Sequence, residues 1–384
     1  MNKKPTVSSM QIALMVAGSA LLFPYTFLSI INTIPANQDV WLCVLLSPIY
    51  MTILSLPALF FSNKFRGMTV SEITETVHNK FSAKLVLILL ALFGLFIFIA
   101  TLSTTTTFSS IYLLKSTPQW AILLLILVPV TYGSIKGAGT IARIAAVFVP
   151  LILGTIVLFF ILGINKMQIS SIMPILKDST FWEINKGAMI IASRFTEIFI
   201  VYLFVRFLKK KESVNKTYFI ALGIYLVGYL LILIPTLMVI GVDVAKISNN
   251  PYFLYTRQVG GYDFLQRLQS FNTLAWLTGT MCKLMFYNYM SSLMISEISK
   301  KIKRNIVTII LSFVGFAYCL VPLFSKQSNS FLLSSDKVLP YVVVPYGFIL
   351  PIIYIIIYLF RKKKIEKILQ EKKVGKYAEV VPDQ

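Results

Sequence analysis

The chain has 384 residues, of which 57% are hydrophobic and 13% are charged, and its net charge is +21. These values exclude an ordinary soluble domain, because a water-facing surface needs more polar side chains. The positive charge does not indicate a nucleic-acid partner, since most of the 36 lysines and arginines flank apolar stretches. Those stretches are about 20 residues long, the length that a helix needs to cross a bilayer.

Apolar stretches of this length predict an all-α polytopic membrane protein, because hydrocarbon offers the backbone no hydrogen-bond partners. We expect about ten transmembrane helices, which in chain order lie at 9–31, 40–61, 84–114, 118–134, 139–164, 187–207, 217–241, 269–296, 305–324 and 339–360. They form one permease-like domain, residues 1–361, followed by a basic tail, residues 362–384. Basic runs such as Lys209–Lys211 and Lys300–Arg304 follow alternate helices and place both termini in the cytoplasm.

Ten crossings divide into five plus five, and an odd number of crossings makes the second half enter from the opposite face. An internal repeat would therefore be inverted, which is the arrangement that places a binding site between the two halves near the midplane. We infer the repeat from the count alone, since the halves show no clear sequence identity. It directs attention to the first helix of each half, at 9–31 and 187–207.

Three ionisable residues lie deep inside the predicted helices: Arg194, Glu197 and Lys283. Each costs about 2.5–3.5 kcal/mol at a helix centre on insertion scales, so each is expected to face the bundle interior and to find a partner. Glu197 and Lys283 lie at similar depths in their helices. The pattern favours a ligand or coupling-ion site halfway across the membrane, and the alternative is a buried ion pair that only fixes packing.

The first helix carries Gly18, Ser19 and Ala20, followed by Pro24. Glycine and proline together would permit an unwound stretch whose backbone N–H groups hold a carboxylate. The alternative is that Gly18 is a point of close packing between helices.

The third predicted helix contains a run of hydroxyl residues from Thr101 to Ser110. Hydroxyls in membrane helices bond to the preceding turn, which accounts for most of the run. Thr101 lies closest to the midplane and is the best candidate to line a cavity. On the outer face, the long loop Asp243–Arg267 is expected to form either a lid over a vestibule or an interfacial cap.

The sequence resembles the spore germination permeases, the B subunits of germinant receptors, in Asn250-Pro251-Tyr252, Arg257, Asp263–Arg267, Trp276, Lys283, Gln11, Gly18 and Pro24. The resemblance covers essentially the whole chain. That family belongs with the amino acid–polyamine–organocation transporters, so the resemblance implies a five-plus-five inverted fold. It also implies a protein of the inner spore membrane that senses a small nutrient, an amino acid or a nucleoside, beside A and C subunits.

Members of the wider superfamily bind their ligand between broken helices one and six. Carried to this sequence, that implicates Gly18, Ser19 and Ala20 on the first helix and Ser193 to Glu197, with Arg194 between them, on the sixth. Lys283 would replace a bound sodium ion, as a lysine does in sodium-independent members. The sixth helix has no glycine or proline after Gly187, so its sequence does not by itself predict a break.

The sequence therefore predicts a germinant-sensing membrane subunit that binds a small ligand at the midplane and signals to partner subunits. An autonomous proton-coupled amino-acid permease is one alternative, and a channel or scaffold opened by partners is another.

No nucleophile–base pair, phosphate loop or metal-ligand cluster is recognisable, so we expect neither an enzyme nor a cofactor. The cysteines Cys43, Cys282 and Cys319 fall inside apolar stretches and are expected to act as small hydrophobic residues.

Overall fold

The computed structural model describes residues 6–26, 28–259, 263–299, 301–321 and 339–378. Over these ranges the chain is built from helices, joined by short loops, and one isolated parallel bridge pairs Val7 with Leu208. The fold class predicted from the sequence, an all-α membrane protein, is confirmed.

The elements, in chain order, are α1 (Ser9–Thr26), η1 (Ser29–Asn32), α2 (Val40–Lys64), α3 (Val70–Val77), α4 (Lys80–Tyr112), α5 (Gln119–Lys136), α6 (Ala138–Gly163), η2 (Ile164–Lys166), η3 (Ile169–Ile172), α7 (Phe181–Ser193), α8 (Ile198–Phe204), η4 (Val205–Phe207), α9 (Val214–Ile240), α10 (Val242–Ile247), α11 (Pro251–Val259), α12 (Asp263–Ile298), α13 (Arg304–Leu320), α16 (Leu339–Val344), η5 (Pro345–Ile349) and α17 (Leu350–Ala378). The elements labelled α are α-helices, η1 to η4 are 3₁₀-helices, and η5 is a π-helix.

Within the described ranges, eight helical segments are long and apolar enough to cross a membrane: Ser9–Thr26, Val40–Lys64, Lys80–Tyr112, Gln119–Lys136, Ala138–Lys166, Phe181–Phe207, Val214–Ile240 and Tyr341–Glu371. The helix α13 is apolar but shorter, and α12, with 36 residues, is not among these eight segments. The observed helices follow the order of the predicted ones along the chain.

The helix α1 and the segment Phe181–Phe207 are the most buried of these eight segments. In α1 and in the segment Phe181–Phe207, 72% of the residues in the most apolar window are buried, against 28% for Tyr341–Glu371. The most extensive helix contact joins α4 to α12, and α1 packs on α9, α6 and α12. Central burial frees α1 and the Phe181–Phe207 segment from lipid, so both can carry polar groups without exposing them to hydrocarbon.

The helix predicted at 187–207 is broken into α7 and α8. Between them the backbone turns more tightly: the N–H of Arg194 donates to the carbonyl of Ile191 at 3.2 Å, and that of Ile200 donates to the carbonyl of Glu197 at 2.9 Å. Side chains support the interruption in place of glycine or proline, because the Ser193 hydroxyl donates to the Ile190 carbonyl at 2.7 Å. The absence of a breaking residue therefore did not prevent the break.

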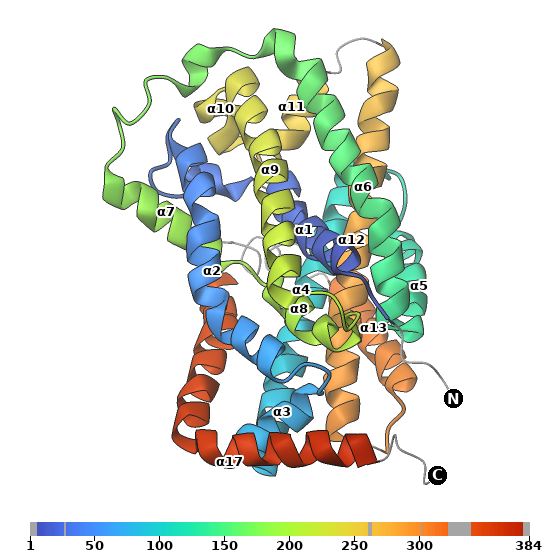
Figure 1. Ribbon diagram of the computed structural model, residues 1–384. Coiled ribbons are helices and arrows are strands. Elements are labelled where there is room, and N and C mark those ends of the chain that lie inside the picture. The colour runs from blue at the N-terminus through green and yellow to red at the C-terminus, as the bar shows by residue number, and fades with distance from the viewer. Residues whose placement is uncertain (1–5, 27, 260–262, 300, 322–338, 379–384) are drawn as a thin grey trace.

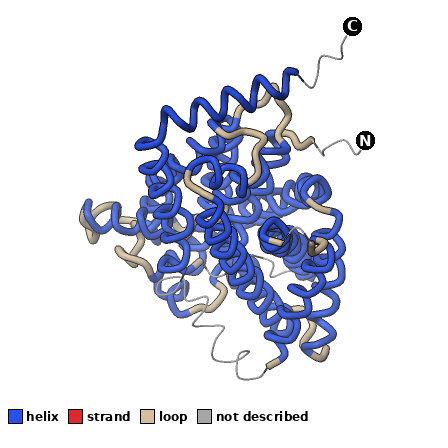
Figure 2. The backbone as a smooth tube through the Cα atoms, turned by 90° about the horizontal axis from the view of Figure 1, so that it is seen from below, coloured by secondary structure: helices blue, strands red, loops and turns tan. Residues whose placement is uncertain are grey.

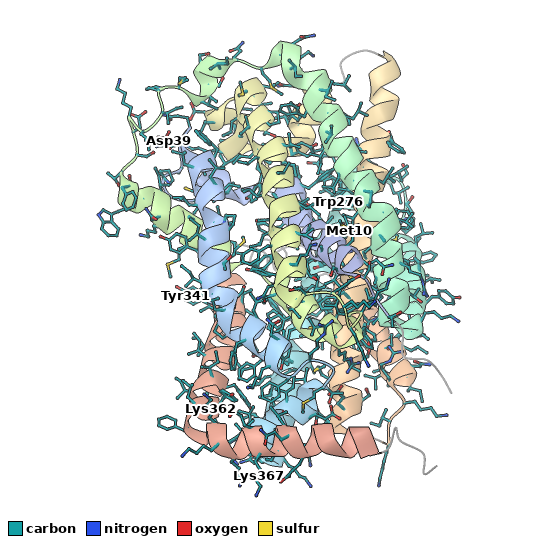
Figure 3. All side chains as sticks on the ribbon, in the orientation of Figure 1. Met10, Asp39, Trp276, Tyr341, Lys362 and Lys367 are labelled. Atoms are coloured by element: carbon teal, nitrogen blue, oxygen red, sulfur yellow. The ribbon has the colours of Figure 1, made fainter. Side chains whose placement is uncertain are left out.

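The two ends of the bundle differ (Figure 1). The helices α10 and α11 cover one end, called here the α11 end. At the opposite end, called the α3 end, lie α3 and the last part of α17, which turns to run across the bundle. Lys362 lies near this turn and Lys367 on the crossing arm (Figure 3). Figure 2, viewed from below, shows the arm along the edge of the bundle.

The part of the predicted tail that the structure describes is helical and is held against the bundle. The guanidinium of Arg361 donates to the carbonyl of Val77 at 2.9 Å, and Lys64 pairs with Glu366 at 3.3 Å. Ile365 is fully buried beneath the arm. Leu369 also packs against the core, while Lys362, Lys363 and Lys364 are exposed, so the arm has an apolar inner side and a basic outer one.

At the α3 end the start of α1 is tied to the end of α8. The N–H of Val7 donates to the carbonyl of Phe207 at 2.8 Å, and the N–H of Lys209 donates to the carbonyl of Val7 at 3.2 Å. Close by, Arg206 pairs with Glu297 at 3.4 Å, and the two side chains are only 18% and 15% exposed. These contacts join α1, α8 and α12 at one end.

The loop predicted to be a lid or a cap packs down on the α11 end. The helix α11 begins at Pro251, as expected, and Tyr252 and Tyr255 are completely buried beneath it. The Tyr255 hydroxyl donates to the carbonyl of Phe159 at 2.6 Å, and the amide of Asn250 donates to the carbonyl of Thr26 at 2.7 Å. The loop therefore closes the bundle at this end; Gly260 and Gly261 lie outside the described residues.

Candidate functional site

A buried ion pair connects the break in the sixth helix to α12. The ammonium of Lys283 lies 3.0 Å from Oε1 of Glu197, and the Ser19 hydroxyl donates to the same oxygen at 3.1 Å. The Lys283 ammonium also donates to the Ser19 carbonyl at 3.4 Å. One carboxylate oxygen thus gathers groups from α1, α12 and the α7–α8 break.

Both members of this pair are buried, so loss of either one would be costly in free energy. The Glu197 side chain is 4% exposed and the Lys283 side chain is 12% exposed. Burying one ionised side chain alone in such surroundings costs several kcal/mol of free energy. A hydrogen-bonded partner of opposite charge offsets most of that cost. The ring of Tyr287 lies 6.0 Å from the ammonium, and its hydroxyl donates to Thr196 at 2.7 Å, which fixes the break from the other side.

A cavity of about 90 Å³ adjoins the pair. It is lined by Ala20, Leu22, Phe23, Pro24, Thr26, Met51, Ile97, Ala100, Thr101, Thr104, Thr105, Ile191, Arg194, Phe195, Thr196, Glu197, Tyr225, Tyr229, Trp276, Thr280 and Lys283. The walls come from α1, α2, α4, α7, the break, α9 and α12. A space of this volume with polar walls can hold several waters or a small ligand.

The structure brings most of the predicted site residues to this cavity. Those that line it are Ala20, Thr101, Arg194, Glu197 and Lys283. Ser19 lies behind the wall and reaches the site through its hydrogen bond to Glu197. The two others lie elsewhere, Gly18 between α1 and α6 and Ser193 in a separate hollow near Asn32 and Tyr341.

Gly18 has a packing role in this structure. A β-carbon added at Gly18 would lie 2.4 Å from Cγ2 of Val149, far inside van der Waals contact. Glycine therefore lets α1 and α6 approach closely, which is the alternative that the sequence left open. The unwound stretch considered for residues 18–20 is not present, because α1 is α-helical from Ser9 to Thr26.

The backbone N–H groups of α1 near Ser19 and Ala20 are not free to hold a carboxylate. They point into the preceding turn and are used inside the helix. Pro24 has no N–H, so the carbonyl of Ala20 loses the donor that a helix would supply four residues later. Ala20 and Pro24 both line the cavity. The backbone donors that the sequence suggested for this part of α1 are therefore not available.

Sequence reasoning missed several lining residues on α9 and α12. Tyr225 and Tyr229 lie on one face of α9 with ring centroids 5.5 Å apart. Their spacing of four residues in an otherwise apolar helix is a signal that could have identified them. The Thr280 hydroxyl donates to the carbonyl of Trp276 at 3.0 Å and keeps its acceptor lone pairs for the cavity.

Aromatic rings separate the cavity from the α11 end. Trp276 donates from Nε1 to the Thr26 hydroxyl at 2.9 Å, and its ring packs 4.4 Å from that of Phe108. Phe108 in turn contacts Tyr112 and Phe253, with centroids 4.7 Å and 5.6 Å away. Those two rings line a second, outer hollow of about 230 Å³. Trp276 and Phe108 therefore lie in one connected group of rings with Tyr112 and Phe253.

The fold and the central ion pair define a membrane protein of the transporter fold. Mhp1, a nucleobase-cation-symport-1 family transporter in a closed conformation with bromovinylhydantoin bound, matches with a TM-score of 0.63 and 14% identity, covering 94% of this chain and 80% of Mhp1. MhsT in complex with L-phenylalanine also matches with a TM-score of 0.63, at 11% identity, covering 93% of this chain and 99% of MhsT. At these identities the likeness concerns the fold.

The sequence comparison is more specific. A family model described as spore germination protein matches residues 6–329, so the chain belongs to that family. The spore germination protein YndE of Bacillus subtilis (strain 168) is 22% identical over 354 residues, which are 91% of this chain and 94% of YndE. The resemblance to the spore germination permeases that was inferred from the sequence is thereby confirmed.

Proposed function

We propose that this chain is the nutrient-sensing membrane subunit of a spore germinant receptor. It binds a small ligand in the cavity beside Glu197 and Lys283 and signals the occupancy of that cavity to partner subunits. The observation that carries the proposal is the buried charge cluster at the α7–α8 break, next to a cavity at the centre of a spore germination protein. A cluster of this kind is costly to keep for packing alone.

The ligand site needs no metal ion in this proposal. The ammonium of Lys283 lies 3.0 Å from the Glu197 carboxylate and donates to the carbonyl of Ser19 at 3.4 Å. In this proposal the ammonium takes the place that a sodium ion would otherwise have at these two oxygens. The lysine therefore supplies a fixed positive charge to the junction of α1, α12 and the break.

The helix α8 provides a direct connection from the cavity to the α3 end. It begins beside Glu197 and ends where Arg206 pairs with Glu297 and Phe207 bonds to Val7. A ligand that contacts the break favours the conformer in which it binds best, and this shifts the contacts at the other end of α8. We assign the α3 end to the cytoplasm because it is rich in basic residues, and there A and C subunits would detect the change in an inner spore membrane.

Replacement of the paired residues in spores tests the proposal. Spores carrying Glu197→Gln or Lys283→Met, at wild-type protein level, should need higher nutrient concentrations to germinate. Lys186→Met, on the exposed face of α7, is the matched control and should leave the dose–response curve unchanged. Wild-type sensitivity in both test variants would remove the pair from the site.

The second candidate is an autonomous proton-coupled amino-acid permease. It is favoured by the transporter fold and by a carboxylate–ammonium pair that could exchange a proton during transport. Proteoliposomes that contain this chain alone should then accumulate labelled alanine, and a protonophore should abolish the uptake. Uptake with these properties would replace the sensor proposal, and its absence together with alanine binding would favour the sensor.

A further inference from the structure

We infer that α4 and α17, where they lie together at the α3 end, bind one anionic phospholipid. Its phosphate lies among exposed lysines, and part of one acyl chain enters an apolar cavity beside α8. This place, called here the α4–α17 site, comprises Lys80, Lys84, Lys362, Lys363, Lys364 and that cavity. It is separate from the central cavity, and the inference does not depend on the function proposed above.

The outer surface of α17 changes from apolar to basic at one point. Ile352, Ile356 and Leu359 are exposed, and Phe360 is 88% exposed. The basic run Arg361–Lys364 follows directly. Exposed apolar side chains followed by lysines mark the boundary between the hydrocarbon and the headgroups of a membrane. The phosphates of one leaflet therefore lie at the level of these lysines.

The start of α4 lies beside this boundary and has the same pattern. The guanidinium of Arg361 donates to the carbonyl of Val77 at 2.9 Å, and α4 begins three residues later at Lys80. Phe81 is 79% exposed, and Lys80 and Lys84 are exposed on either side of it. Two helices thus bring an exposed aromatic ring and exposed lysines to one level. Aromatic rings and lysines are the side chains that contact headgroups at a membrane interface.

Acidic side chains next to these lysines already have partners. Glu366 pairs with Lys64 at 3.3 Å, and Glu75 accepts from the Ser71 hydroxyl at 3.2 Å. Glu72 belongs to the capping box at the start of α3. The five lysines of the α4–α17 site therefore leave an excess of positive charge, which an anionic headgroup balances.

An apolar cavity of about 50 Å³ lies on the hydrocarbon side of the lysines. Val86 and Leu90 of α4 line it, and so do Leu350 and Pro351 of α17. These residues lie within three helical turns of Lys84 or Phe360, further into the membrane. Leu350 and Pro351 are partly exposed, so this wall of the cavity adjoins the lipid. The cavity is therefore at the depth that an acyl chain occupies when its phosphate is among the lysines.

The cavity suits hydrocarbon better than water. A buried water needs two to four polar partners, and an apolar cavity stays dry. The Thr74 hydroxyl in the wall already donates to the carbonyl of Val70 at 2.8 Å, and Phe61 and Ile73 are apolar. The volume is below the roughly 150 Å³ of a cavity that holds benzene, so it fits a short part of a chain. Phe199 also lines the cavity, so a bound chain contacts the helix that follows the break.

The first test separates this site from diffuse attraction between a basic protein and an anionic membrane. Binding of phosphatidylglycerol and of phosphatidylcholine to the delipidated full-length protein is measured by native mass spectrometry. The wild type should bind phosphatidylglycerol about 10- to 100-fold more tightly, the range expected for a few lysines near one phosphate. The triple variant Lys80→Gln, Lys84→Gln, Lys362→Gln should lose that preference.

The matched control removes the same charge elsewhere at the α3 end. The triple variant Lys209→Gln, Lys210→Gln, Lys211→Gln changes three exposed lysines outside the α4–α17 site and should keep the preference for phosphatidylglycerol. An equal loss in both triple variants would show diffuse attraction and would overturn the inference. So would a wild type without the preference, or its persistence in the first triple variant.

The second test fills the cavity. Ala58→Leu adds bulk to the wall, and Gly347→Ala is the milder change. A β-carbon at Gly347 would lie 3.8 Å from Cγ1 of Val343 and 3.9 Å from Cε2 of Phe199, which is ordinary contact, so this variant should fold. Both variants should bind the two lipids several-fold more weakly. Gly223→Ala on α9, where a β-carbon meets nothing within 4 Å, should bind them as the wild type does.

Thermal unfolding in detergent shows which variants are folded, and Gly347→Ala decides if Ala58→Leu is not. Wild-type lipid affinity in the folded cavity variants would show that no chain enters the cavity and would overturn the inference. Glycerophosphoglycerol, which has the headgroup without the chains, is added as a competitor and should not displace the lipid. Displacement as effective as that by phosphatidylglycerol would make this a site for free phosphate esters and would also overturn the inference.

Discussion

The ammonium of Lys283, near the middle of α12, lies 3.0 Å from Oε1 of Glu197, the last residue before α8 begins. The pair holds an interrupted helix against a continuous one. Ser19 of α1 adds a hydrogen bond to the same carboxylate oxygen. The helix α1, the helix α12 and the α7–α8 break therefore meet at one electrostatic junction.

Removal of one partner from this junction should be more damaging than removal of both. Lys283→Met leaves the Glu197 carboxylate buried without its cation, at a cost of about 3–5 kcal/mol. The double variant Glu197→Gln, Lys283→Met avoids the isolated charge and should unfold at a higher temperature than Lys283→Met alone. Thermal unfolding in detergent measures both.

A matched control for these melts is Lys186→Met, which changes an exposed lysine of the neighbouring helix α7 and should shift Tm by no more than other surface substitutions. If the double variant unfolds at a lower temperature than Lys283→Met, the charge pair is not the main interaction at the junction.

Gly18 should tolerate no side chain while Val149 faces it. Gly18→Ala places a methyl group 2.4 Å from Cγ2 of Val149, and overpacking of this kind costs about 1–3 kcal/mol. Val149→Ala removes the obstructing methyls, so the double variant should recover stability relative to Gly18→Ala. A double-mutant cycle of unfolding free energies measures the recovery.

Gly154, on the same helix α6 as Val149, provides the control because a β-carbon there meets nothing within 4 Å. Gly154→Ala should be neutral or slightly stabilising, since alanine is the better helix former. Additive effects in the Gly18–Val149 cycle would show that the two positions do not touch.

The packing of α11 on the bundle should be loosened by loss of the Tyr255 hydroxyl. Tyr255→Phe removes the 2.6 Å hydrogen bond to the carbonyl of Phe159, at a cost of about 0.5–1.5 kcal/mol. Hydrogen exchange in α11 should become faster, with little change in α4. Tyr132→Phe, at a 62% exposed position on α5, should leave the exchange rates of α11 unaltered. If the amides of α11 are equally protected from hydrogen exchange in Tyr255→Phe and in the wild type, α11 is held in place by packing alone.

The ion pair at the α3 end should set the threshold of the response. Arg206→Gln together with Glu297→Gln removes the 3.4 Å pair without leaving a single buried charge. If α8 carries the signal, the contacts at its far end stabilise the unstimulated conformer, and the double variant should germinate at several-fold lower nutrient concentration. Spore dose–response curves measure the shift. A curve that coincides with the wild type would exclude this pair from the signalling route.

The central features of the site were predictable because charge inside a membrane obeys a strong constraint. Arg194, Glu197 and Lys283 stood out as costly residues that must face inward and find partners, and Glu197 does pair with Lys283. Thr101 followed from its depth and lines the cavity. The long apolar stretches gave the order of the helices, since hydrocarbon thickness sets their length.

Other features depended on tertiary contacts that the sequence does not report. The break in the sixth helix is supported by hydrogen bonds from Ser193 and from Tyr287 to Thr196, and neither bond follows from local propensity. Gly18 was compatible with both an unwound stretch and close packing, and only the position of Val149 on α6 decides between them. In helices that are apolar on all sides, periodicity does not reveal which face meets a cavity, so Tyr225 was missed.

The most direct test of the account is a cryo-electron microscopy map of the full-length protein saturated with the nutrient to which its spores respond. The account predicts ligand density in the cavity bounded by Ala20, Thr101 and Arg194, beside an intact Glu197–Lys283 pair. Density at another position with this cavity empty, under conditions where the nutrient is bound, would contradict it.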